Sequence, residues 1–294
     1  MRYLLALALT VLLSSPSMAA LKVVTSFSIL ADIVKQIGGD HVAIDNIVGA
    51  NEDAHVFNPA PQHSVMLAKA DVVVVNGLGF EGWIDRLIKA SGFKGSVIVA
   101  SEGVKPIKLE ENTSTFHQGS PQDPHAWHSI PLVMKYVDNI STALQKSDPE
   151  HAKEFKRNAT SYKQRLRFLD EWVKDELSRI DPKKRKVITA HDAFQYFAHE
   201  YKIAFLAPQG VSTQAEATPE AVKALIDLIH KEDIKTIFVE NITNEKQMQM
   251  IRESTGARIG GTLYSDALSD VDGPAPDYVS LMKHNVSLII SSMK

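Results

Sequence analysis

The sequence predicts an α/β protein of two lobes, each a mostly parallel sheet flanked by helices, joined by one long backbone helix. Three observations predict this class. Short runs of nearly continuous Val and Ile recur along the chain, and each is followed by a stretch with helical periodicity, which is typical of parallel sheets covered on both faces. Two series of such units are present. Between them lies a long, highly charged stretch without a helix-breaking residue after Pro149.

The first series supplies the lobe expected over residues 20–147. LKVVTSF (21–27) is a buried-strand pattern, and SILADIVKQIGG (28–39) places Ile29, Ile33, Val34 and Ile37 on one helical face before a Gly stop. The further elements expected are the strand HVAIDNIV (41–48), the strand DVVVVNG (71–77), a helix over 79–92, the strand GSVIVAS (95–101) with a long loop after it, and a helix over 129–146.

The charged stretch DPEHAKEFKRNATSYKQRLRFLDEWVKDELSRI (148–180) predicts the linking helix, which we assign to residues 148–181. At 1.5 Å per residue it would run about 45 Å, as long as a whole domain. Its apolar positions are Phe155, Leu166, Leu169, Trp172, Val173 and Leu177.

The second lobe, expected over 182–294, repeats the alternation. Its predicted elements are the strand KVITAH (186–191), a helix over 192–201, the strand IAFLAPQ (203–209), a helix over 218–233, the strand KTIFVE (235–240), a helix over 244–256, the strand ARIGGTLYS (257–265) and a closing helix over 277–293.

The N-terminus has the three-part pattern of a secretory signal peptide, which we assign to residues 1–19. Arg2 precedes an apolar run from Leu4 to Leu13, and small residues at Ser17 and Ala19 suit cleavage after about Ala19. The run is shorter than the roughly 20 residues that span a bilayer. The chain has no cysteine to form disulfides or carry a lipid near the cleavage point. We therefore expect a freely diffusing, monomeric protein, and the bacterial periplasm fits best.

The charge composition also argues against a nucleic-acid partner. The net charge is −3, with acidic and basic residues interspersed. A nucleic-acid-binding protein normally shows a basic patch or stripe. We therefore expect no nucleic-acid partner.

Three of the eleven histidines lie at or after the ends of predicted strands. His55 lies in the loop after HVAIDNIV, His125 in PQDPHAW after GSVIVAS, and His191 at the end of KVITAH. Asp266 follows ARIGGTLYS in the same way. Ligands gather outside the carboxyl ends of parallel strands, and three imidazoles with one carboxylate can form a four-coordinate zinc site. Coincidence of polar residues in polar loops remains the rival interpretation, and for most other histidines we expect surface or capping roles.

Four segments together resemble those of one family. DAHVFNP, DPHAWHS, ITAHDAFQYF and LYSDALSDVDGPAPDYVSLMKHN are similar to the metal-site segments of the cluster A-I, TroA/ZnuA-like solute-binding proteins of zinc and manganese ABC importers. The likeness covers essentially the whole mature chain. It implies a metal held between the lobes by His55, His125, His191 and Asp266, and delivery of that metal to a membrane permease.

Three departures from the family bear on the site. His128 stands where the family often has leucine, so we expect it to be a neighbour of the site rather than a ligand. The loop before His125 has only one histidine, His117, where zinc specialists often have many; it would be at most an accessory contact. Some manganese members have Glu at the position of His191. The resemblance therefore leaves zinc and manganese both open.

The ligand types favour zinc, because imidazole suits Zn²⁺ whereas carboxylate oxygens suit Mn²⁺, and because Zn²⁺ outranks Mn²⁺ in intrinsic affinity. The second ring nitrogen of a ligand histidine normally donates to an acceptor. Glu240, at the end of KTIFVE, and Asp192, beside His191, are the candidates. The alternative interpretation of Glu240 is an ordinary acidic residue at a strand end, and that of Asp192 is a helix N-cap.

Two other function classes fit parts of the pattern. A secreted zinc hydrolase uses three protein ligands and water, but the sequence has no HExxH motif and no clear general base. An adhesin is a role often attached to surface members of the family. The expected absence of a lipid anchor argues against that role, and we expect no enzyme activity.

Overall fold

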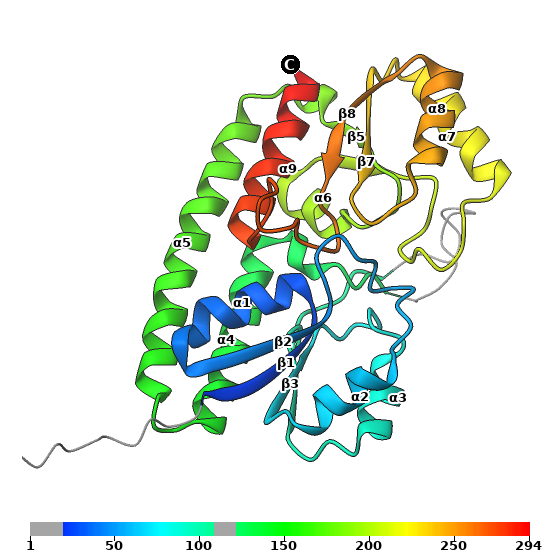
Figure 1. Ribbon diagram of the computed structural model, residues 1–294. Helices are drawn as coiled ribbons and strands as arrows, with labels where there is room; N and C mark the ends of the chain where they lie inside the picture. The colour runs from blue at the N-terminus through cyan, green and yellow to red at the C-terminus, as the bar shows by residue number, and fades with distance from the viewer. Residues whose placement is uncertain (1–19, 109–121) are drawn as a thin grey trace, which may run out of the picture.

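The computed structural model describes residues 20–108 and 122–294. The predicted signal peptide and His117 lie outside these residues. Two parallel four-stranded sheets, each flanked by helices, confirm the predicted α/β class (Figure 1). Within the described ranges, no helix is both long and apolar enough to cross a membrane.

The first lobe is built on a sheet of order β2-β1-β3-β4. The all-valine strand β3 is completely buried, and it pairs with β1 and β4 on its two sides. The strands are β1 Leu21–Phe27, β2 Val42–Val48, β3 Val72–Val75 and β4 Ser96–Val99; the helices are α1 Ser28–Gly38, α2 Pro61–Ala68, α3 Ile84–Ser91 and α4 Ile130–Ser147, with short 3₁₀ turns at Gly39–His41 and Ala126–His128.

Two elements of this lobe differ from expectation. The helix predicted over 79–92 begins only at Ile84, because Gly79 lies at a positive φ and Gly82 follows closely. Helix α2 was not predicted. It buries only His63 and Leu67, so its sequence lacks the apolar periodicity that marks a longer helix.

The second lobe repeats the strand order as β6-β5-β7-β8. Side-chain caps at Thr218, Asn244 and Asp277 begin three of its helices. The strands are β5 Lys186–Ile188, β6 Ala204–Leu206, β7 Thr236–Glu240 and β8 Arg258–Leu263; the helices are α6 Gln195–Tyr201, α7 Pro219–Lys231, α8 Glu245–Thr255 and α9 Tyr278–Met293, after a 3₁₀ turn at Pro182–Lys184.

The long helix α5, Ala152–Ser178, runs along one side of both lobes with α9 beside it (Figure 1). It packs against α1 and α4 of the first lobe and against α6 and α9 of the second. Its buried stripe includes Phe155, Tyr162, Leu166, Leu169, Val173 and Leu177, which recur at helical spacing.

One hydrophobic core runs through both lobes. It contains Val73 of β3 and Leu166 of α5, and it continues through Leu263 of β8 to Ile289 of α9. A separate cluster fills the space between the second sheet and the helices α7 and α8, around Ile237 and Ile251. Because packed cores resist large shifts, a shared core favours small movements between the lobes over wide opening.

Candidate metal centre

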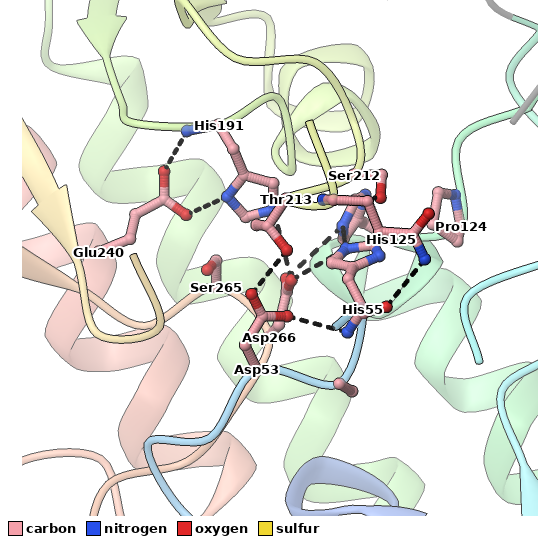
Figure 2. Close-up of polar contacts among 12 residues, drawn as sticks. Asp53, His55, Pro124, His125, His191, Ser212, Thr213, Glu240, Ser265 and Asp266 are labelled. Carbon is pink, nitrogen blue, oxygen red and sulfur yellow. Dashed lines mark hydrogen bonds and ion pairs between the residues drawn. The ribbon is translucent and has the colours of Figure 1, made fainter. Parts of the chain in front are cut away.

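The side chains of His55, His125, His191 and Asp266 meet between the two lobes (Figure 2). One ligand atom from each lies within 4.8 Å of the other three. His55 Nε2 lies 3.3 Å from His125 Nε2 and 3.2 Å from Asp266 Oδ2. His191 Nε2 lies 3.3 Å from the same oxygen, and His125 Nε2 lies 3.6 Å from Asp266 Oδ1. All four side chains are buried.

Each side chain reaches this point from a different segment. His191 and Asp266 follow closely on β5 and β8, as the strand-end argument predicts. His55 lies in the connection between β2 and α2. His125 comes after the long connection that follows β4, as predicted, and it directly precedes the 3₁₀ turn Ala126–His128 that leads into α4.

Two of the histidines are held by a carboxylate. Glu240 Oε1 accepts the backbone N–H of His191 at 2.8 Å, and Glu240 Oε2 lies 2.5 Å from His191 Nδ1. Asp123 Oδ1 accepts the backbone N–H of His125 and contacts His125 Nδ1, both at 2.8 Å. A carboxylate in this position fixes the ring so that Nε2 faces the centre, and it strengthens the ring as a ligand.

His55 has a different support. Asp53 Oδ1 accepts its backbone N–H at 2.8 Å, as Asp123 does for His125. The other oxygen of Asp53 accepts from Thr213 Oγ1 at 2.6 Å and does not contact the imidazole. Among the described residues, the only carboxylate paired with the His55 ring is Asp266, at Nε2.

The charges within the site are strongly coupled. Burial lowers the pKa of His125, but the Asp266 and Asp123 carboxylates outweigh this effect and raise the pKa to about 9. Burial likewise lowers the pKa of His191, and Glu240 with Asp266 raises it well above the usual value. For His55 burial prevails, and its pKa is lowered. Burial acts to raise the pKa of Asp266, yet His191 and His125 hold it well below its usual range.

The unsatisfied atoms of this cluster suit a cation. Neither Asp266 oxygen has a hydrogen bond of normal geometry among the described residues, and His191 Nε2 has none. Leaving a buried polar atom unpaired costs about 1–3 kcal/mol. Three imidazole nitrogens and one carboxylate that converge on a point are a donor set that holds divalent transition metals.

His128 lies beside this centre but outside the group of four. It is fully buried, and its ring packs 4.4 Å, centroid to centroid, from the ring of Phe194. Neither of its ring nitrogens has a hydrogen-bond partner of normal geometry in the described chain. Burial, with the positive charge of His125, lowers the pKa of His128 to about 3, so its ring is neutral.

The structure gives different neighbours to the two predicted acceptors. Glu240 contacts His191, as described above. Asp192 Oδ1 instead accepts from Gln195 Nε2 at 2.6 Å, near the start of α6. Sequence reasoning did not identify Asp123 or Asp53. Their common spacing, an Asp two residues before each histidine in DAH and DPH, was the signal that could have found them.

The chain is similar to known metal-binding proteins. Residues 23–292 match the family described as "Zinc-uptake complex component A periplasmic". The chain is 34% identical to the manganese-binding lipoprotein MntA of Bacillus subtilis, over 93% of this chain and 90% of that protein. It is 33% identical to the iron-binding protein YfeA of Yersinia pestis, over 91% and 85%.

A solved structure is also similar. The Mn-bound periplasmic metal-binding protein from Candidatus Liberibacter asiaticus superposes with a TM-score of 0.82 at 29% identity, covering 93% of this chain and 100% of that one. These matches support solute binding and give no support to the zinc hydrolase or the adhesin left open above. The shared fold and the family match over nearly the whole chain show that this protein belongs to the ZnuA family of extracytoplasmic solute-binding proteins of metal ABC importers.

Proposed function

We propose that this protein captures a divalent transition metal ion with His55, His125, His191 and Asp266 and delivers it to an ABC permease for import. The observation that carries the proposal is the convergence of these four side chains from both lobes, with ligand atoms within 4.8 Å of one another. Four protein ligands close the coordination sphere, which suits binding and not catalysis.

The ligand set favours Zn²⁺ over Mn²⁺ in intrinsic affinity, because three donors are imidazole and because Zn²⁺ stands higher in the order of divalent affinities. The relatives named for manganese and for iron support a first-row divalent ion as cargo. The ion carried in the cell then depends on supply as well as on affinity. Manganese is the cargo when it is the more available ion.

Three further points belong to the same proposal. The protein acts as a monomer in the periplasm, after removal of residues 1–19. Residues 20–147 and 182–294 form the two metal-binding lobes, and residues 148–181 link them. The helix α5 makes up most of the link and contacts helices of both lobes, which supports its role as a rigid connection. No nucleic acid takes part.

Metal analysis of protein purified without chelators tests the proposal, together with competitive Zn²⁺ and Mn²⁺ titration of the wild type and of His191→Ala. We expect about one equivalent of metal in the wild type, tighter binding of Zn²⁺ than of Mn²⁺, and a large loss of affinity in the variant. Binding of neither metal at better than millimolar affinity would sink the proposal.

A further inference from the structure

The segment 209–217, here called the strap, connects the metal-site loops of the two lobes. At its start, Gln209 forms a parallel bridge with His191, and Gly210 O accepts the N–H of Asp192. Further along, Gln214 Nε2 donates to His55 O at 3.0 Å. The strap therefore touches the His191 segment of its own lobe and the His55 segment of the opposite lobe.

Asp53 joins the strap to His55 more directly. One of its oxygens receives the His55 backbone N–H, and the other receives the hydroxyl of Thr213 in the strap. At His125 and His191 the corresponding carboxylate contacts the imidazole itself. At His55 the second carboxylate oxygen of Asp53 instead accepts from Thr213, which makes a contact between the lobes.

His55 is consequently the least secured of the three histidine ligands. The described residues place no carboxylate at its Nδ1, whereas Asp123 and Glu240 occupy this position for the other two rings. Its side chain retains 4% exposure, and the other three side chains have none. A surface cavity of about 380 Å³, lined by Asp53, Thr213 and Glu216 among others, lies next to its support.

We propose that metal release begins at His55 and that the Asp53–Thr213 contact is the latch that controls its rate. A shift of the strap breaks this contact and the Gln214 bond to His55 O. The loop that carries His55 is then free to withdraw. Asp123 and Glu240 keep His125 and His191 in place, so the ion is left with three protein ligands and an open side. Asp53 and Thr213 act as positioning residues, and this inference rests on the proposed function.

Thr213→Val tests the latch, because it removes the hydroxyl and keeps the shape of the side chain. Release of Zn²⁺ from the full mature chain to a colorimetric chelator is followed by stopped flow. A hydrogen bond to a charged group is strong enough for its loss to change a rate about tenfold or more. We expect release at least about tenfold faster in Thr213→Val, near-wild-type release in Thr213→Ser, and no change in the control Thr160→Val on the exposed face of α5.

A double-mutant cycle distinguishes the latch from a general loosening of the strap. If Thr213 acts through Asp53, Thr213→Val accelerates release in the wild type but has little further effect in Asp53→Asn or in His55→Ala. Equal acceleration in all backgrounds overturns the proposal. If His55→Ala releases metal too quickly to measure, the Asp53→Asn background decides alone.

The result of the latch experiment can be distinguished from the result that would contradict the proposed function. A wild type that binds no metal contradicts the function. A wild type that binds metal but releases it at the same rate as a folded Thr213→Val contradicts only the latch. Thermal unfolding of each metal-free variant shows whether it is folded. Should Thr213→Val fail to fold, Gln214→Ala, which removes the second contact of the strap with the His55 segment, is expected to accelerate release and contradicts the proposal if it does not.

Discussion

The Glu240 carboxylate makes three contacts at the end of β5. It accepts the backbone N–H groups of Ala190 and His191, and it contacts His191 Nδ1. The strand β7 that ends at Glu240 is completely buried. The contact therefore lies at the carboxyl end of an interior strand, and it sets the direction in which His191 Nε2 points. Glu240, which is not a candidate ligand, thus determines the orientation of the candidate ligand His191.

Glu240→Gln should weaken metal binding by about 10–100-fold, which is typical of losing a carboxylate behind a ligand histidine. The amide keeps the size of the side chain but removes its charge. Competitive titration with a metal indicator measures the affinity. Glu253→Gln, on the exposed side of α8, is the matched control and should bind as the wild type does. Unchanged affinity in Glu240→Gln would show that the contact does not support the ligand.

Metal affinity should rise with pH through the neutral range and at least to about 9, the pKa of His125. In the metal-free protein His125 has a pKa of about 9, and the pKa of His191 is raised well above the usual value, so both rings carry a proton at neutral pH. The metal must displace these protons. Affinity is therefore lost as pH falls, by roughly tenfold per pH unit for each displaced proton. Calorimetry in buffers of different ionisation enthalpy counts them; no proton release at pH 7 contradicts this picture.

Binding of metal should stabilise the fold, because the ion binds only the folded arrangement of four segments. At a free metal concentration 100 times the Kd the gain is about 2.7 kcal/mol, which corresponds to a rise in Tm of about 5 °C or more. Scanning calorimetry with metal and with chelator measures the difference. Asp266→Asn should lose most of this shift, while Asp227→Asn on the exposed face of α7 should keep it.

His128→Leu should stabilise the protein and leave metal affinity close to that of the wild type. The substitution removes a buried ring whose nitrogens lack partners of normal geometry, and such groups cost about 1–3 kcal/mol. Urea unfolding measures the gain. His125→Leu, three residues earlier, should abolish binding. A large loss of affinity in His128→Leu would instead make His128 a part of the metal site.

The two histidines of PQDPHAWHSI illustrate what a local sequence contains. Both belong to the same short turn, and both are fully buried. His125 Nδ1 is held by Asp123, whereas the His128 ring packs against Phe194 of the second lobe. The partner of the His125 ring is local, but the packing of His128 against Phe194 depends on a segment far away in the sequence. The resemblance to a family predicted only His125 as a ligand.

A resemblance of four segments to one family predicted the set His55, His125, His191 and Asp266. The sequence by itself also determined the α/β class, the alternation of strands and helices along the chain, and the long helix. These features rest on local patterns: buried strands such as VVVV, apolar residues at helical spacing, and polar residues at strand ends. Tertiary structure alone decided the rest. It brought the candidate Glu240 against His191 Nδ1 and Thr213 against Asp53, pairs that lie 49 or more positions apart, and it joined the two lobes in one core. Their distances depend on how the two sheets and α5 pack together, which no local pattern encodes.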